Sequence, residues 1–304
     1  MNTIVYLNGK FVPYQKALIP IDTHALHYGT GCFEGIRGYW NSQHKKLYVF
    51  RLADHYQRLK RSCATLSMRL PLTVPKLCQT TSELLKQCNY DTGVYIRPLV
   101  YKSSQTVTEF NLDKLSDGLT ILTQPLGHYL NVTCGIKVIT SSWQRVSASM
   151  IPPFAKPTGI YLNTALAKTE AEAKGAAEAI LTNPDGSISE GSAENIFLVK
   201  NNRLYTPSLD QNILEGITRN TIIELARKEL DISTIQRKIM TTELTGADEV
   251  FLTGTGAEVT PVIKIDKKKV GNGQIGPITQ QLQDIYFRVV HGNHPKYTHW
   301  ITAV

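Results

Sequence analysis

The chain of 304 residues lacks several features that mark particular protein classes. It has no uninterrupted apolar run long enough to span a bilayer, which argues against a membrane protein. Its first residues, from Met1 to Tyr6, lack a basic start, an apolar stretch and a small-residue cleavage site. We therefore expect no export and a cytoplasmic location. Internal repeats and low-complexity tracts are also missing.

Cysteine pairs and metal-ligand patterns are missing as well. The five cysteines are an odd number and include no CxxC spacing, which argues against a disulfide framework and against a zinc site. His24 and His27 stand three residues apart, but no third ligand follows at a suitable spacing. We expect reduced thiols, hydrogen-bonded histidines and no metal.

The basic excess is not concentrated along the chain. The net charge is +8, but Lys267 to Lys269 form the only basic triplet, and no aromatic residues interleave with it. A nucleic-acid partner is therefore not expected. With 42% hydrophobic and 19% charged residues, the composition is that of a globular protein, and the length favours two domains.

Alternating strand and helix patterns predict an α/β (α+β) chain of two domains. The boundaries expected are 1–123 for a small N-terminal α/β domain, 124–132 for a linker and 133–304 for a larger C-terminal domain. Apolar spacing and turn residues predict a hairpin over Thr3 to Pro13, strands at Leu47 to Phe50, Val94 to Tyr101, Leu119 to Thr123, Ile136 to Thr140, Asn195 to Lys200 and Glu249 to Thr253, and helices at Arg51 to Leu66, Val74 to Cys88, Thr164 to Gly175 and Thr218 to Glu229.

Two residues could serve a Schiff-base cofactor such as pyridoxal phosphate. Lys156 lies between Phe154 and Pro157, so its amine is expected near apolar groups, where desolvation favours the neutral nucleophile. Glu190 follows a short strand and could face a pyridine nitrogen, although Glu194 could do so equally well by position alone. A surface lysine and a turn carboxylate are the plainer alternatives.

Further segments could hold anions. Gly216 to Arg219 opens a helix, and Gly254 to Gly256 follows a strand, so both could approach a phosphate, although Thr218 could be a simple helix cap. Tyr95 and Arg97 share one face of an apolar strand, where a guanidinium needs an anion. That anion could be a substrate carboxylate or an internal ion-pair partner.

In combination these motifs resemble the fold type IV pyridoxal-phosphate enzymes, specifically the branched-chain amino acid aminotransferases. The matching stretches are His24 to Gly29, Phe33 to Arg37, Tyr95 to Pro98, Ser141 to Trp143, Ser189 to Gly191, Gly216 to Arg219 and Gly254 to Pro261. The resemblance implies a small and a larger domain with the cofactor, pyridoxal 5'-phosphate, between them.

The resemblance also implies a role for individual residues. Lys156 would form the internal aldimine and move the proton at the substrate Cα. The residues implied in cofactor binding are Lys156, Arg58, Tyr161, Glu190, Ile217, Thr218 and Thr255. Those implied in substrate binding are Tyr95, Thr255 and Gly256 for the α-carboxylate, Phe33, Tyr28 and Tyr129 for an apolar pocket, and Arg97 with Arg37 for a distal carboxylate.

The implied reaction is ping-pong transamination of leucine, isoleucine and valine with 2-oxoglutarate, giving branched 2-oxo acids and L-glutamate. The family resemblance further implies at least a homodimer and leaves a hexamer open, with the segment Ser103 to Glu109 closing the neighbouring pocket. Three positions depart from common family patterns. Leu126 could widen the pocket, while Ile160 and Ala193 could alter cofactor geometry slightly.

Other functions remain open at this point. A D-amino acid aminotransferase or an aminodeoxychorismate lyase of the same fold would share Lys156 and Glu190. A protein of another class, which binds the cofactor or a polyanion without turnover, would keep the same residues. Preference among branched, aromatic and other amino acids is not decided by these motifs.

Overall fold

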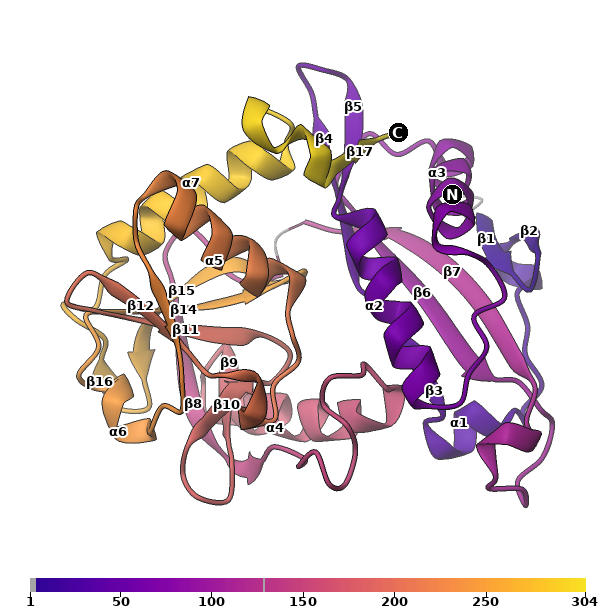
Figure 1. Ribbon diagram of the computed structural model, residues 1–304, viewed down its shortest axis with the longest axis horizontal. Coiled ribbons are helices and arrows are strands. Elements are labelled where there is room, and N and C mark those ends of the chain that lie inside the picture. The colour runs from indigo at the N-terminus through magenta and orange to yellow at the C-terminus, as the bar shows by residue number, and fades with distance from the viewer. Residues whose placement is uncertain (1–3, 128) are drawn as a thin grey trace. The chain divides into compact units, whose positions relative to one another are not determined.

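The computed structural model describes residues 4–127 and 129–304, which form two compact units. The first unit comprises the described residues of Met1–Gly127 together with Ala155–Ile160 and Val289–Val304. The second comprises those of His128–Phe154 and Tyr161–Arg288. Each unit has its own sheet and helices (Figure 1), so the expected mixed α/β fold class is confirmed.

The sheet of the first unit runs in the order β17-β5-β4-β6-β7-β1-β2, and β3 also pairs with β6. Its strands are β1 (Ile4–Leu7), β2 (Lys10–Pro13), β3 (Gly31–Phe33), β4 (Ile36–Asn41), β5 (Lys46–Phe50), β6 (Val94–Lys102), β7 (Asp117–Pro125) and β17 (Ile301–Ala303). Its helices are α1 (His24–Tyr28), α2 (Leu52–Thr65) and α3 (Val74–Cys88), with 3-10 turns η1 (Tyr14–Lys16), η2 (Leu112–Lys114), η3 (Thr158–Ile160) and η5 (Pro295–Trp300).

The two long helices of this unit follow their sequence patterns closely. The apolar face predicted for α2 is buried, including Tyr56 and Leu59, and it packs into the same core as Leu77 and Leu84 of α3. The Thr73 side chain caps α3 by accepting a hydrogen bond from the Lys76 N–H. Both helices contribute to one apolar core against the sheet.

The expected hairpin is close to its predicted place, and part of the expected linker belongs to a strand. β1 and β2 pair antiparallel around Asn8 and Gly9, which both have positive φ. Thr3, the first residue of the predicted hairpin, lies outside the described residues. Of the expected linker 124–132, Gln124 and Pro125 belong to β7, and His128 lies outside the described residues.

A break in the strand beside β6 positions several polar groups. β3 pairs with β6 from Leu99 to Tyr101, β4 pairs with it from Val94 to Ile96, and Glu34 and Gly35 fill the gap between β3 and β4. The gap lies beside Pro98, which has no N–H to donate and accepts from the Glu34 N–H instead. Proline is therefore tolerated inside this sheet.

The last part of the chain belongs to the first unit, which the sequence patterns did not indicate. β17 pairs antiparallel with β5, with Ile301 opposite Phe50. The segment around Lys156 also belongs to this unit. The sequence-based division at 124–132 placed both segments in a C-terminal domain, and it took no account of strands that return to an earlier sheet.

The sheet of the second unit runs in the order β10-β9-β8-β15-β14-β11-β12-β13, with β16 on β15. Its strands are β8 (Ile136–Gln144), β9 (Glu178–Thr182), β10 (Ile188–Gly191), β11 (Asn195–Lys200), β12 (Arg203–Thr206), β13 (Thr234–Gln236), β14 (Glu249–Gly254), β15 (Glu258–Ile265) and β16 (Lys268–Lys269). Its helices are α4 (Tyr161–Ala173), α5 (Ile217–Glu229), α6 (Thr241–Leu244) and α7 (Pro277–Val290), with the turn η4 (Leu209–Gln211).

Small side chains allow α4 to pack closely on this sheet. Ala167 and Ala171 are buried against Ala179 and Leu181 of β9. The helix begins at Tyr161, three residues before the predicted Thr164, and therefore includes one of the expected cofactor ligands at its first position. Gly175, with a φ of 69°, follows its end as expected.

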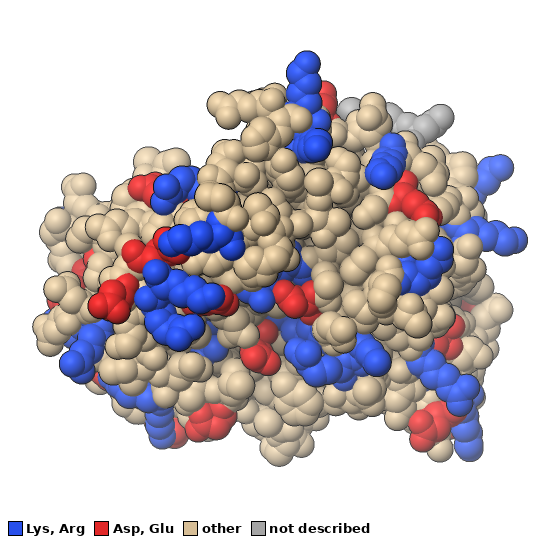
Figure 2. All heavy atoms as spheres, turned by 45° about the horizontal axis from the view of Figure 1, so that its top comes forward, with Lys and Arg blue, Asp and Glu red and all other residues tan. Residues whose placement is uncertain are grey.

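Charged side chains of both signs share the surface, as the dispersed basic residues of the sequence predict. On the face drawn in Figure 2, Lys and Arg side chains are interspersed with Asp and Glu. Within the described chain, no helix has both the length and the apolar character needed to cross a membrane.

Candidate active site

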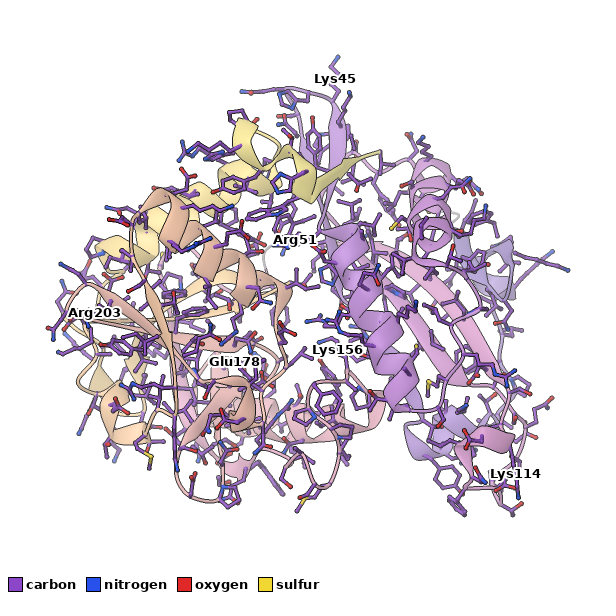
Figure 3. The ribbon with its side chains drawn as sticks, in the orientation of Figure 1. Lys45, Arg51, Lys114, Lys156, Glu178 and Arg203 are labelled. Carbon is purple, nitrogen blue, oxygen red and sulfur yellow. The ribbon has the colours of Figure 1, made fainter. Side chains whose placement is uncertain are left out.

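The main chain at Lys156 is held on both sides within the first unit. Its carbonyl oxygen accepts a hydrogen bond from the Phe33 N–H at 3.1 Å, and its own N–H donates to Ser62 Oγ at 3.3 Å. Figure 3 shows Lys156 beside α2, the helix that carries Ser62. Pro157 forms an isolated bridge with Cys32. β3 and α2 together therefore fix the backbone from which the Lys156 amine extends.

Phe33 is the aromatic neighbour of the Lys156 amine. Nζ lies 5.1 Å from the centre of its ring, and the Arg97 guanidinium carbon lies 4.1 Å from the same centre. Both are within cation–π distance. Phe154, the neighbour expected from the sequence, is 59% exposed. The apolar surroundings of the amine thus come from β3 and not from the adjacent residues of the chain.

A buried carboxylate holds Arg58. Glu34 accepts hydrogen bonds from Arg58 Nε at 2.7 Å and Nη2 at 2.8 Å, and from His55 Nδ1 at 2.7 Å. Burial alone would raise the pKa of Glu34, but Arg58 and His55 outweigh it, and the pKa falls to about 2. Burial lowers the pKa of His55, so its neutral ring donates to the carboxylate. The guanidinium is thereby held in one orientation by a two-point contact.

Tyr95 and Arg97 do share one face of β6, as predicted from the alternation of the strand. Arg97 donates to the Tyr95 hydroxyl from Nε at 3.1 Å and from Nη2 at 2.6 Å. The hydroxyl lies over Gly35, where an added Cβ would approach it to 2.5 Å. Arg97 is half-buried. The desolvation cost expected from the sequence for a buried guanidinium is therefore smaller here.

Arg37 and Tyr28 occupy different surroundings. Arg37 on β4 is buried, stands opposite Tyr95 in register, and donates from Nη2 to the Gly127 carbonyl at 2.8 Å. The hydroxyl of Tyr28 on α1 donates to the Val107 carbonyl at 2.7 Å, and its ring contacts Phe110. Tyr28 therefore belongs to a cluster formed by α1 and the segment 103–110.

In the second unit, Glu190 on β10 is surrounded by donors. Arg145 Nη2 lies 2.7 Å from Oε1, while Asn195 Nδ2 and the Leu214 N–H donate to Oε2 at 3.0 and 3.1 Å. Arg145 and Glu190 are both buried. A carboxylate with these three donors is stabilised in its anionic form.

Glu194 differs from Glu190 although it is four residues away. It accepts the Ala193 N–H at 3.0 Å, but burial and the neighbouring carboxylates of Glu178 and Glu190 raise its pKa to about 8. It is therefore protonated at neutral pH. The sequence left open which of the two would face a pyridine nitrogen, and the donors around Glu190 favour that residue.

Gly216 and Asn195 link Glu190 to the start of α5. A Cβ at Gly216 would lie 1.9 Å from Asn195 Oδ1, so only glycine permits this approach. Ile217 is the first residue of the helix, and the side chain of Thr218 is buried. Arg219 turns away, because its guanidinium donates to the Pro207 carbonyl at 3.0 Å and to Gln236 at 2.9 Å. The helix start remains suited to an anion.

The turn after β14 lies beside Tyr129. An added Cβ at Gly256 would be 3.7 Å from the Tyr129 ring, so the ring rests on this backbone. Thr255 lies in the same turn and is partly exposed. Tyr161, at the start of α4, is also partly exposed.

The predicted site residues thus divide into groups within each unit. The first unit brings together Lys156, Phe33, Arg58, Tyr95 and Arg97, with Arg37 beside Tyr95. The second links Glu190 to Ile217 and Thr218, and Tyr129 to Gly256.

Sequence reasoning missed the residues that hold these groups. Glu34 was inside a quoted motif, and its place beside two basic side chains depends on α2 packing against β3. Nothing in the sequence indicated a role in the site for Arg145, Asn195 or His55. His24 and His27 are hydrogen-bonded, as expected. His24 contacts Thr30 Oγ1 and the Glu109 carbonyl, and His27 contacts the Ile21 carbonyl. Among residues 4–127 and 129–304, no group of His, Cys, Asp and Glu could hold a metal ion.

Comparisons with known proteins agree with this arrangement. Residues 31–265 match the family model described as amino-transferase class IV. A probable branched-chain-amino-acid aminotransferase of Aquifex aeolicus (strain VF5) is 46% identical over 299 residues, which cover 98% of this chain and 96% of that protein.

Solved structures are similar over nearly the whole chain. The branched-chain aminotransferase of Thermoproteus uzoniensis with norvaline gives a TM-score of 0.94 at 42% identity, covering 99% of each chain. The branched-chain amino acid aminotransferase of Thermobaculum terrenum in its PLP-form gives 0.94 at 36% identity, covering 99% of this chain and 98% of that one. The chain therefore belongs to the class IV aminotransferase family.

Proposed function

We propose that this protein transfers the amino group of branched-chain L-amino acids to 2-oxoglutarate in a ping-pong reaction that depends on pyridoxal 5'-phosphate. The observation that carries the proposal is the placement of the Lys156 amine and the Arg97 guanidinium around Phe33. An amine, an apolar ring and a cation together suit a site that must take both leucine-like and glutamate-like side chains.

The residues present fit the cofactor. Glu190 is an anionic carboxylate suited to a pyridinium nitrogen, and α5 begins with a buried hydroxyl and a glycine, as a phosphate site requires. Arg58 supplies a fixed cation. When bound, pyridoxal phosphate offers an aldehyde that accepts the amine and a ring that takes up the electron pair released at Cα.

Each side chain would then have a defined task. Lys156 would bind the aldehyde carbon and move the proton at the substrate Cα. Glu190 would hold the proton on the pyridine nitrogen, and Tyr161 would donate to the ring oxygen. Arg58, Ile217, Thr218 and Thr255 would bind the phosphate.

The substrate would be held by a second set of residues. Tyr95, with the backbone of Thr255 and Gly256, would bind the α-carboxylate. Phe33, Tyr28 and Tyr129 would line the apolar part of the pocket. Arg97, with Arg37, would pair with the distal carboxylate of glutamate or 2-oxoglutarate.

A homodimer, which could assemble further into a hexamer, is part of the proposal. Large apolar side chains are exposed on and near α1 and the segment 103–110, namely Leu18, Ile19, Ile21, Leu26, Val107 and Phe110. Exposed apolar groups gathered in this way are typical of subunit interfaces. The same segment includes Ser103 to Glu109, proposed to close the pocket of the partner. We place the enzyme in the cytoplasm.

A substrate scan tests the reaction. Purified protein loaded with pyridoxal phosphate is mixed with L-leucine, L-glutamate and D-alanine, and the absorption of the cofactor is followed. Conversion by L-leucine and L-glutamate is expected, with Lys156→Ala as the control that loses multiple turnover. Conversion by D-alanine alone would favour a D-amino acid aminotransferase, and an unchanged spectrum would favour binding without turnover.

Substitution of Arg97 by leucine tests the two-substrate pocket. Loss of one partner of a close charge pair costs about 2–5 kcal/mol, roughly thirtyfold or more in kcat/KM. Arg97→Leu should therefore slow the glutamate half-reaction by about this factor and the leucine half-reaction much less, in stopped-flow measurements at equal cofactor content. Equal losses for both substrates would mean that Arg97 serves the α-carboxylate or the fold.

A further inference from the structure

Lys168 lies on α4 in the second unit and has no task in the proposed reaction. Its side chain is 21% exposed, and its Nζ lies 3.3 Å from Glu178 Oε2 and donates to the Ala177 carbonyl. Glu172, one helical turn away, is 3.8 Å from the same ammonium. Partial burial of an ammonium costs desolvation energy, which a buried carboxylate partner can offset.

Glu178 is the buried carboxylate that holds the Lys168 ammonium in place. Its side chain is fully buried, and its other oxygen accepts the Ala179 N–H at 2.7 Å. Burial lowers the pKa of Lys168, but Glu178 and Tyr129 outweigh it, so the pKa is raised and the ammonium stays charged. Removing one member of such a pair would leave the other charge buried without compensation. The Lys168 ammonium is therefore held in one position beside β9.

Tyr129 lies against the Lys168 ammonium. The Lys168 Nζ is 5.4 Å from the centre of its ring. Burial raises the pKa of the Tyr129 hydroxyl, and the nearby ammonium opposes the rise. On its other side the ring lies against Gly256, where an added Cβ would be 3.7 Å away, an ordinary van der Waals distance. Tyr129, which is 51% exposed, thus contacts a charged side chain on one side and the turn after β14 on the other.

We propose that Lys168 is a positioning residue, which fixes Tyr129 over Gly256 and thereby sets how well the pocket discriminates branched from short side chains. The proposal rests on the proposed function, in which Tyr129 lines the apolar pocket. Lys168 itself touches neither substrate nor cofactor in this account. Its effect passes through the orientation of one ring.

The test compares two amino acids that use the pocket differently. Leucine fills the side-chain pocket, whereas alanine does not reach it, so the ratio of their half-reaction rate constants reports on the position of Tyr129. In Lys168→Met this ratio should fall about tenfold, which is within the range expected for loss of a partly desolvated cation–π contact. Lys168→Arg, which keeps the charge, should retain most of the ratio. Binding of 4-methylpentanoic acid, an unreactive branched carboxylate, should weaken in parallel.

Two further variants separate positioning from folding. Lys168→Met with Glu178→Gln leaves no buried charge uncompensated, so it should fold and still show the reduced ratio. In a Tyr129→Leu background, the Lys168→Met change should lower the ratio much less than in the parent, because the ring that the ammonium contacts is already lost. Lys174→Met, which removes an exposed pair with Glu170 just after the same helix, is the control.

The outcomes are distinct. An unchanged leucine-to-alanine ratio in the neutral double variant, or full additivity with Tyr129→Leu, would overturn the positioning role and leave Lys168 as part of the fold. A parent protein that reacts with neither amino acid would instead overturn the proposed function.

Discussion

Glu34 in the first unit and Glu194 in the second are both buried, with 0% and 4% of their surface exposed, yet their pKa values move in opposite directions. Burial would raise the pKa of Glu34, but the Arg58 and His55 side chains overcome it and lower the pKa to about 2. At Glu194, burial and two carboxylate neighbours raise the pKa to about 8. Burial is common to both, so the neighbours decide the sign.

The charges around Glu194 explain its proton. Three carboxyl groups, Glu178, Glu190 and Glu194, interact in this part of the second unit, and two cations, Lys168 and Arg145, pair with the first two. The third carboxyl has no cation of its own in these pairs and keeps its proton. Where a cation is aimed at a buried carboxyl, the group can serve as a permanent anion, and otherwise it becomes a neutral hydrogen-bonding group.

The largest effect is expected where the buried pair is broken. Glu34→Gln leaves the Arg58 guanidinium buried beside an amide, which costs about 3–5 kcal/mol of unfolding free energy. Urea unfolding at pH 7 measures it, with Glu83→Gln on α3 as a control on the helix surface. A loss equal to that of the control would mean that Arg58 finds other partners and that the comparison overstates the role of Glu34.

A smaller effect of opposite sign is expected at Glu194. Its folded pKa of about 8 lies above the unfolded value of 4.5, so the folded state binds the extra proton and stability falls as pH rises between these values. Glu194→Gln removes this dependence and should stabilise the protein at pH 9 relative to the parent, by an amount that shrinks as the pH falls toward 5. Unfolding at pH 5, 7 and 9 measures it. A parallel pH profile in parent and variant would show that Glu194 is ionised in the folded protein.

Glu34 should act at the other end of the pH range. Its folded pKa of about 2 lies below the unfolded value of 4.5, so its contribution is complete above pH 4.5 and is lost as pH falls toward 2.

The smallest effect tests whether a low pKa alone signifies stability. Lys174 lowers the pKa of Glu170 to about 2, the same value as for Glu34, but the lysine is 55% exposed. Solvent screens such pairs, so Lys174→Met should cost only about 0.3–0.5 kcal/mol. Thermal unfolding at low and high salt measures this. A cost near that of Glu34→Gln would remove the distinction between exposed and buried pairs.

The sequence predicted local structure well, because local patterns determine it. The helix predicted over Val74 to Cys88 has the same ends as α3. The alternation in β6 places Tyr95 and Arg97 on one face. The residues that hold the site were not predictable in the same way. The Glu34 contact with Arg58 requires β3 to pack on α2, and Arg145 reaches Glu190 from the residue that follows β8. The family resemblance named the residues that would act, but not those that orient them.

The pairing of β17 with β5 has a consequence for synthesis on the ribosome. Residues 301–303 complete the sheet of the first unit, and they are made after the whole of the segment Tyr161–Arg288. The second unit can therefore fold while the first still has an unpaired strand edge at β5. An exposed edge of this kind invites pairing with other chains, so slow translation near the end of the message would lengthen the period in which nascent chains are prone to aggregate.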